Sequence, residues 1–152
     1  MWTICAESVE SPQAVGLLRD YFAELTVRYF HRETTEQEID ETLDEFPTTG
    51  LALFLVLRAS GAPAGCLGLY PTGELTRIYV APNFRRLGGA RALLTAAESW
   101  ARDHGLARLF LDTRTDLAEA RALYDAYGFK EIPSPTTKPG PFQDHWFEKH
   151  IA

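Results

Sequence analysis

The chain lacks most of the signals that define small stapled or metal-held proteins. Its 152 residues contain two cysteines, Cys5 and Cys66, which form neither a CxxC pair nor a set with histidines at metal-ligand spacing. The sequence therefore indicates no disulfide framework and no zinc site. Both cysteines lie in strand-like apolar runs, so we expect free, buried thiols in a reducing compartment.

Long apolar runs and an excess of basic charge are also missing. No apolar run approaches membrane-spanning length, and the first seven residues show no basic segment followed by an apolar core. We therefore expect a cytoplasmic protein with no signal peptide and no membrane contact. Lys and Arg number 15 against 21 Asp and Glu, a net charge of −6. This balance argues against nucleic acid as the main partner.

The chain has enough apolar residues to form the core of one domain, which we expect to cover residues 1–152. Hydrophobic residues make up 45% and charged residues 24%, which is typical of a globular protein. The charge is uneven. Residues 33–45 hold seven acidic side chains and no basic one, whereas residues 85–91 hold three arginines and no acid. The acidic run is either a solvated helix face or a wall that attracts a cationic substrate.

The spacing of apolar residues predicts strands in alternation with helices. Apolar residues recur at helical spacing after Pro12, and Thr34 or Thr35 can cap a second, acidic helix. The predicted helix stripe after Pro12 is Val15, Leu18, Phe22, Leu25 and Tyr29. Two later helices are expected near residues 90–104 and 117–127, and a proline-rich loop is expected over 133–141. Strands are expected at residues 2–6, 51–57, 64–70, 74–80, 109–111, 129–132 and 145–151.

The connections between these elements define the fold class. Residues 74–111 read as a strand, a helix and a parallel strand, whereas the earlier strands are joined by hairpin-length turns. We therefore predict an α/β protein with a mixed, mostly antiparallel sheet of six to seven strands, and about four helices on both faces.

The sequence from Arg85 to Ala90, RRLGGA, follows a strand and opens a helix. Backbone N–H groups are unpaired at a helix start, the helix dipole is positive there, and glycine lets the backbone approach an anion. The loop therefore predicts a phosphate site. A plain strand-to-helix connection is the alternative, but the paired arginines disfavour it. Arg86 and Arg91 are either solvated or reach the phosphates.

A second motif follows downstream, where Leu123-Tyr124-x-x-x-Gly128-Phe129 ends the next predicted helix. Together with Arg85, Gly88 and Ala90, this motif resembles the paired signatures of the GNAT acyltransferases. The resemblance extends from the first strand to the last, and it implies the GNAT fold with acetyl-CoA as the cofactor. It also implies transfer of the acetyl group to an amine.

By this resemblance, backbone amides from Arg85 to Arg91, including Gly88, Gly89 and Ala90, hold the pyrophosphate. The backbone of Ile78, Tyr79 and Val80 pairs with the pantetheine arm, because an extended ligand carrying amides can add to a free strand edge. The cofactor then lies between the strands at 74–80 and 108–113.

Tyr124 is the expected catalytic residue. A phenol, with a reference pKa of about 10, can protonate the thiolate that leaves when an amine attacks a thioester. The alternative is a core tyrosine on the apolar stripe of its helix. The attacking amine must be neutral, and Glu74 is the best candidate base, although an exposed glutamate at a strand end is at least as plausible. The other options are His31, His104, His145 and His150. Tyr127 is interpreted as a packing residue.

One position departs from the family pattern. Many members carry an asparagine seven residues before the catalytic tyrosine, where this chain has Leu117. That puts the side-chain contact to pantetheine in doubt, and the adjacent Asp116 can simply cap the helix. Leu111-Asp112-Thr113 with Glu119-Ala120 resembles one subset of the family whose members have diverse functions.

The sequence thus predicts an acetyl-CoA-dependent N-acetyltransferase, either a monomer or a homodimer. The acceptor is an amine, with a lean towards a cationic small molecule or a peptide amine. The rival hypothesis is a non-catalytic module that binds or senses acyl-CoA. No G-x-S-x-G elbow, GxGxxG or GxxxxGK is present, so a hydrolase triad and a nucleotide-binding regulator are less favoured.

Overall fold

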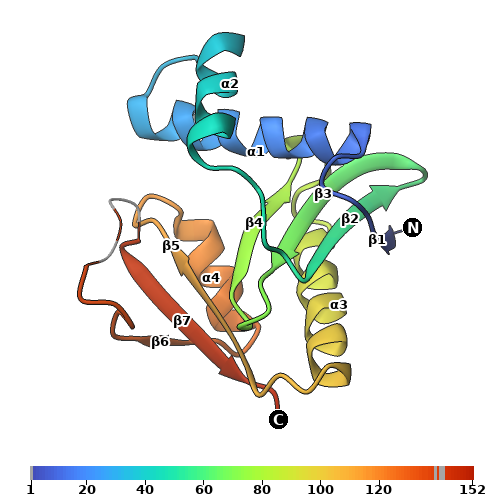
Figure 1. Cartoon of the computed structure of the whole chain (residues 1–152), viewed down its shortest axis with the longest axis vertical. Helices are drawn as coiled ribbons and strands as arrows, with labels where there is room; N and C mark the ends of the chain where they lie inside the picture. The colour runs from blue at the N-terminus through green and yellow to red at the C-terminus, as the bar shows by residue number, and fades with distance from the viewer. Residues whose placement is uncertain (1, 139, 141–142) are drawn as a thin grey trace.

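A computed structural model describes residues 2–138, 140 and 143–152 of the chain. Its first sheet has four antiparallel strands in the order β1-β2-β3-β4 (Figure 1). The strands are β1 (Trp2–Ala6), β2 (Leu53–Ala59), β3 (Ala62–Leu69) and β4 (Leu75–Val80). The second sheet has three antiparallel strands in the order β5-β7-β6. They are β5 (Arg108–Thr113), β6 (Lys130–Ile132) and β7 (His145–His150).

The helices fill the connections between the strands. They are α1 (Pro12–Phe30), α2 (Glu36–Glu45), α3 (Gly89–Asp103) and α4 (Ala118–Ala126), with a 3-10 turn, η1 (Pro82–Phe84), before α3. The α/β class is confirmed, with seven strands and four α-helices among the described residues. No described helix has both the length and the apolarity that a bilayer crossing requires.

The two sheets meet at one point. A single parallel bridge joins Glu74, just before β4, to Phe110 of β5, and beyond it the strands have no ladder. The parallel strand-helix-strand unit is therefore present, but the strands of this unit diverge instead of pairing. The chain forms two sheets where the sequence predicts one, because periodicity reports which residues are buried and not which edges pair.

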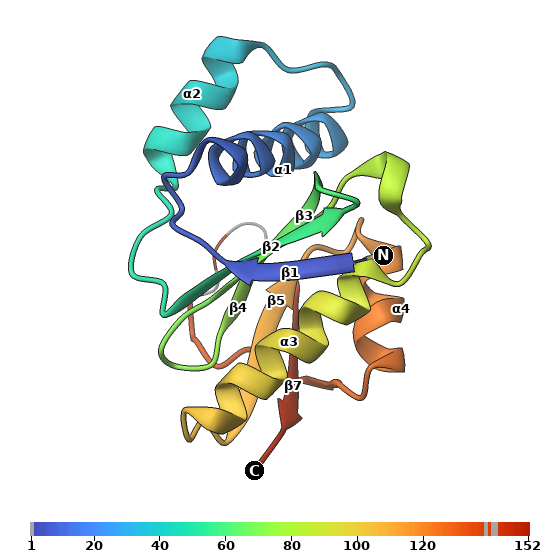
Figure 2. The same cartoon turned by 90° about the vertical axis from the view of Figure 1, so that its right-hand side faces the viewer.

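Helices cover both faces of the first sheet (Figure 2). Leu55 and Leu57 of β2 pack into the core that contains the apolar face of α3, whereas Phe54 and Val56 pack against α1. This alternation explains the continuous apolar run of β2, since both faces of the strand are covered. Helix α2 lies on the outer side of α1, and α4 packs against the second sheet through Tyr124, Phe129 and Phe147.

Two expectations about burial are wrong. Leu18 and Phe22 of the predicted α1 stripe are buried as expected, together with Ala14 and Leu17, but Val15 and Tyr29 are 41% and 52% exposed. Cys5 is exposed, because β1 is the outer strand of its sheet; Cys66 in β3 is buried and free, as expected. The predicted loop over 133–141 includes Pro139 and Pro141, which lie outside the described residues; its other residues carry no regular structure.

Candidate functional site

The diverging strands β4 and β5 border a cavity of about 750 Å³. Residues from α1, from the loop before α3, from the start of α3 and from α4 complete its lining. Every cofactor-binding residue that the sequence predicts lines this cavity, and so does Tyr124. Glu74 does not line it. The cofactor-binding residues are Ile78, Tyr79, Val80, Arg85, Arg86, Gly88, Gly89, Ala90 and Arg91.

The start of α3 opens onto the cavity with its backbone donors uncapped. Gly88 is the N-cap, with φ 85°, and no side chain bonds to the N-terminus of the helix. A left-handed φ favours glycine, and a Cβ at Gly88 would meet no described atom within 4 Å, so open space surrounds it. The first intrahelical bond runs from Ala92 N–H to the Gly88 carbonyl. The preceding N–H groups of the first turn are therefore available to an anion.

Gly89 has a different physical reason to be glycine. A Cβ there would come 2.8 Å from Cδ2 of Leu57 and 3.5 Å from the Trp2 ring. The start of α3 thus sits close against the first sheet, which fixes where its free N–H groups point.

The Arg85 side chain braces this loop. Its Nε donates to the Val80 carbonyl at 2.8 Å, and its guanidinium pairs with Glu24 of α1 at 2.5 Å. Arg86 and Arg91 have no ion pair within 4 Å in the described part of the chain, and both line the cavity. Arg91 lies 5.1 Å from the Tyr127 ring centroid. Of the three arginines, Arg86 and Arg91 are the two that remain able to meet a phosphate.

Strand β4 carries a bulge where it borders the cavity. Thr76 pairs with Gly68 and Tyr79 with Cys66, so two residues of β4, Arg77 and Ile78, lie opposite Leu67 of β3. Arg77 has φ 50°. The bulged residues leave the ladder, and the other edge of β4 has no partner strand beyond the Glu74 bridge. Unpaired main-chain groups therefore face the cavity along β4.

Tyr124 reaches the cavity from α4. The residue is 6% exposed and its ring contacts Phe129 and Phe147, with centroids 5.9 and 6.0 Å away. Burial raises the pKa of its hydroxyl above the usual tyrosine range, and the neighbouring Tyr21 and Asp112 raise it further. The hydroxyl makes no hydrogen bond to a described residue. Tyr124 therefore presents a protonated phenol to the cavity, while Tyr127 packs against Lys149 and Phe129.

A second tyrosine, Tyr21 of α1, lines the cavity from the opposite wall. Burial raises its pKa to about 12. Its ring meets those of Phe22 and Tyr79 edge-on, at 5.0 and 6.4 Å between centroids. The sequence prediction missed Tyr21, because the predicted stripe shares only Leu18 and Phe22 with the buried face of α1 and leaves out the side that carries Ala14, Leu17 and Tyr21.

Two carboxyl groups lie near the point where β4 and β5 meet. Asp112 of β5 lines the cavity, and burial raises its pKa; its side chain accepts a long 3.5 Å bond from Gln143. Burial also raises the pKa of Glu74, and the nearby Asp112 adds to this shift. Neither forms an ion pair within the described ranges. Glu74 is thus coupled to the cavity through Asp112, a residue that the sequence prediction did not select.

Comparison with known proteins identifies the family. The profile of the acetyltransferase (GNAT) family matches residues 17–129. The chain belongs to the GNAT acetyltransferase family. Among solved structures, it is similar to the PaiA N-acetyltransferase of Thermoplasma acidophilum in complex with coenzyme A. The TM-score is 0.76 and the identity 18%, over 99% of both chains. At this identity the likeness shows the fold.

Two proteins with similar sequences match only part of this chain. An uncharacterized N-acetyltransferase, YjgM of Escherichia coli (strain K12), is 34% identical over 104 residues, which are 64% of this chain and 62% of the relative. The aminoglycoside N(6')-acetyltransferase type 1 of Stenotrophomonas maltophilia is 41% identical over 61 residues, 40% of each chain. The chain thus covers less than two thirds of the length of both relatives.

The position of the family asparagine is occupied differently in this GNAT chain. Leu117 is the N-cap of α4, lines the cavity, and makes no side-chain hydrogen bond to the helix. The expected alternative, a helix cap by Asp116, is wrong. Asp116 instead pairs with Arg114 at 2.5 Å. The apolar Leu117 replaces a polar contact on this wall.

The histidines do not line the cavity. His145 contacts Glu131 through Nδ1 at 2.9 Å and Thr115 through Nε2 at 3.1 Å. His31 ends α1 and His104 ends α3, where its ring stacks on Trp100. His150 contacts Glu148.

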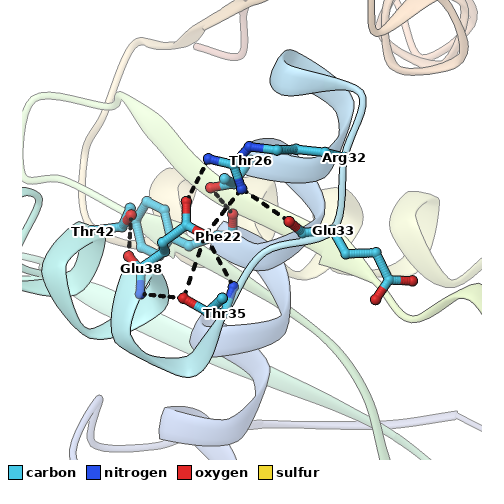
Figure 3. A network of polar contacts seen from close by, with 7 residues as sticks. All are labelled: Phe22, Thr26, Arg32, Glu33, Thr35, Glu38 and Thr42. Carbon is cyan, nitrogen blue, oxygen red and sulfur yellow. Dashed lines mark hydrogen bonds and ion pairs between the residues drawn. The ribbon is translucent and has the colours of Figure 1, made fainter.

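The acidic segment 33–45 does not reach the cavity either. Thr35 caps α2 in a reciprocal box with Glu38, and Arg32 pairs with Glu38 through both guanidinium nitrogens (Figure 3). Arg19 of α1 pairs with Glu36 and Asp40, each at 2.6 Å. These charges fasten α2 to α1, so the solvated-helix interpretation describes the segment better than the acceptor wall.

Proposed function

We propose that the protein transfers the acetyl group of acetyl-CoA to a primary amine by direct attack. The observation that carries this proposal is one cavity lined by an uncapped helix N-terminus, a free strand edge and a protonated phenol. Membership of the GNAT family supports the reaction class. Each part of acetyl-CoA has residues in this cavity that suit its chemistry.

The residues around α3 suit the pyrophosphate of acetyl-CoA. N–H groups at the start of α3 supply donors, the helix dipole favours the negative charge, and Arg86 and Arg91 supply positive charge nearby. Gly88 leaves open space for the anion. The amides of the pantetheine arm suit the free edge of β4 from Ile78 to Val80.

The bulge in β4 suits the thioester carbonyl. A main-chain N–H that has left its ladder is a donor that requires no reorganisation, and such donors stabilise the charge that develops on a carbonyl oxygen. The proposed donor is the backbone at Arg77 and Ile78, which line the cavity.

In the transfer, the amine nitrogen bonds to the carbonyl carbon and the carbon–sulfur bond breaks. The departing sulfur takes a proton, and Tyr124 is the proposed donor because its raised pKa keeps the phenol protonated at neutral pH. The ammonium gives its first proton to Asp112 or Glu74, whose raised pKa values bring them closer to working pH, and the second proton, released as the amide forms, returns the Tyr124 phenolate to phenol through water.

The acceptor is proposed to be an amine that arrives as a cation. Asp112 and Glu74 together offer negative charge that no described cation neutralises within 4 Å. An ammonium group meets that charge and then gives up a proton to it. The aminoglycoside acetyltransferase among the relatives supports testing polyamines and aminosugars first, with peptide N-termini as the next group.

The test is an acetyl-CoA-dependent thiol-release screen over amines, amino acids and peptides, beside calorimetry with acetyl-CoA, ATP and NAD. We expect acetyl-CoA alone of the three ligands to bind, and at least one cationic amine to release thiol. A protein that binds ATP or NAD but not acetyl-CoA contradicts the proposal.

The rival function, an acyl-CoA sensor, keeps the phosphate site and lacks the chemistry. Tyr124→Phe separates the two, because it removes only the hydroxyl. We expect kcat to fall by about 100-fold with the Kd for acetyl-CoA nearly unchanged. Tyr127→Phe is the matched control on the same helix end and should retain kcat. Acetyl-CoA binding without turnover towards any amine favours the sensor.

A further inference from the structure

Arg77 combines an unusual backbone with an unusual set of side-chain bonds. It stands in the bulge of β4 with φ 50°, a left-handed conformation that residues other than glycine rarely adopt. Its carbonyl accepts the buried S–H of Cys66 at 3.3 Å. Nothing in the local sequence, Leu75-Thr76-Arg77-Ile78, favours this conformation, so contacts from elsewhere must hold it.

Those contacts come from the guanidinium, which bonds to the connection between α2 and β2. Nε donates to the Thr48 hydroxyl at 2.8 Å and Nη2 donates to the Phe46 carbonyl at 3.1 Å. Nη1 donates to the Thr76 hydroxyl at 3.0 Å, back on β4 itself. The guanidinium carbon also lies 5.3 Å from the centroid of the Phe22 ring on α1.

We propose that Arg77 is a positioning residue, which sets the bulge of β4 by anchoring its side chain to residues 46–48. This inference rests on the proposed function, in which the bulge supplies the donor for the thioester carbonyl. The planar fork of an arginine fixes direction as well as distance, because three of its nitrogens bond to three separate oxygens. A guanidinium fixed in this way prevents the strained backbone from relaxing into a regular strand.

The contacts given for the Arg77 guanidinium are with residues 46–48, Thr76 and Phe22, and none of them is with residues 85–91 of the described structure. Loss of the anchor should therefore disturb the carbonyl end of the cavity and spare the pyrophosphate end. A residue that merely stabilised the fold would affect both.

The variants separate backbone from side chain. Arg77→Gly adopts a positive φ freely, so any defect in it reports loss of the guanidinium. Arg77→Ala also loses the guanidinium, but alanine is strained at a positive φ just as arginine is. Arg77→Lys retains the charge over Phe22 but cannot make the three-way fork. Arg58→Ala is the control: it removes an arginine of β2 that ties the sheet to Glu7 and Gln13 and does not line the cavity.

The experiment needs no acceptor. It measures the infrared carbonyl band of bound acetyl-CoA that carries ¹³C at the thioester carbonyl, and calorimetry gives the Kd. We expect the wild type to shift the band to lower frequency. Arg77→Gly and Arg77→Ala should lose at least about half of that shift, with the Kd within about threefold of wild type. Arg77→Lys should lose part of it, and Arg58→Ala none. If the glycine and alanine variants do not fold, the lysine variant carries the test.

Two results overturn the inference. A wild-type band shift in folded Arg77→Ala or Arg77→Lys removes Arg77 from this role while leaving the proposed function intact. A wild type that does not bind acetyl-CoA overturns the proposed function and this inference together.

Discussion

The two walls of the cavity are built in different ways. On the wall proposed to bind acetyl-CoA, the groups on offer belong mainly to the backbone: the uncapped start of α3 at Gly88 and the free edge of β4. On the α1 side of the cavity, arginine side chains make the contacts that hold α1 and the neighbouring α2–β2 connection in place. Arg114 donates to the Leu25 carbonyl, Arg77 to the Phe46 carbonyl, and Arg28 pairs with Glu119.

This difference suggests which part of the cavity has a fixed geometry and which part changes when single side chains change. Backbone donors at a helix start depend mainly on a few glycines and on close packing such as that of Gly89, with Arg85 as a side-chain brace. A wall that is held by arginines changes with each of them. We therefore infer that the start of α3 is the generic part of the cavity and that the acceptor is selected at the opposite end, near Asp112 and Glu74.

The largest loss of stability is expected at Gly73, next to the bridge that joins β4 to β5. Gly73 has φ 97°, and a Cβ there would clash with the Arg108 carbonyl beside the bridge of Glu74 to Phe110. Gly73→Ala should lower the free energy of unfolding by about 2–4 kcal/mol. Gly61→Ala, with φ 85° and open space, is the control and should cost about 1 kcal/mol. Urea denaturation measures both; equal losses would show that the contact is unimportant.

The next effect is confined to the acetyl-CoA wall. Gly88 and Gly105 bracket α3, both with positive φ and open surroundings, so alanine should cost each a similar stability of about 1 kcal/mol. Gly88→Ala should also weaken acetyl-CoA binding by about 10- to 100-fold, because it moves the N–H donors. Calorimetry should find Gly105→Ala unaffected. Equal affinities in the two variants would place the phosphate elsewhere.

A third change acts at the acceptor end and depends on pH. Because the folded chain raises the pKa of Asp112, its stabilising contribution is present below the ordinary value of 3.8 and is lost as the pH rises through the folded pKa. Asp112→Asn should therefore raise the melting temperature at pH 8, and the gain should vanish near pH 3.5. The same variant should lower kcat/KM for the acceptor by about tenfold. A melting temperature that falls at pH 8 would show that the Asp112 carboxylate is stabilised in the folded chain.

The smallest effect tests whether a residue of α1 changes the affinity for acetyl-CoA. Glu24 of α1 pairs with Arg85 beside the proposed phosphate site. Glu24→Gln removes a negative charge there and should tighten acetyl-CoA binding by about two- to fivefold, more at low salt. Asp40→Asn also breaks an ion pair to α1, with Arg19, but far from the loop, and should leave the Kd unchanged. Weaker binding in Glu24→Gln would show that the pair is needed to shape the loop.

The sequence predicted the backbone-built wall well because its signals are local. The glycine that takes a positive φ, the start of a helix after a strand and the motif that ends a later helix are each specified by a run of only a few residues. Gly88 and Gly128 have φ 85° and 102°, and the predicted cofactor-binding residues line one cavity with Tyr124. The roles of these residues stay predictions until they are measured.

The other wall was poorly predicted because it depends on pairing and phase. The stripe from Val15 to Tyr29 has the same period as the buried face from Ala14 to Phe22, and only the neighbouring sheet distinguishes them. For the same reason, the sequence analysis did not select Tyr21 as a site residue. Asp112 gains its position from the separation of β4 and β5, and Arg77 from a bulge that no local residue specifies.

The most direct test of the proposed acetyl-CoA site is an amide-resolved NMR titration of the wild-type protein with acetyl-CoA. We expect saturable shifts for the amides of Ile78 and Val80 and for those from Gly88 to Arg91, with little change along α2 from Glu36 to Glu45. ATP should not reproduce the pattern. Binding that leaves the start of α3 and the edge of β4 unshifted would contradict the placement of acetyl-CoA between β4 and β5.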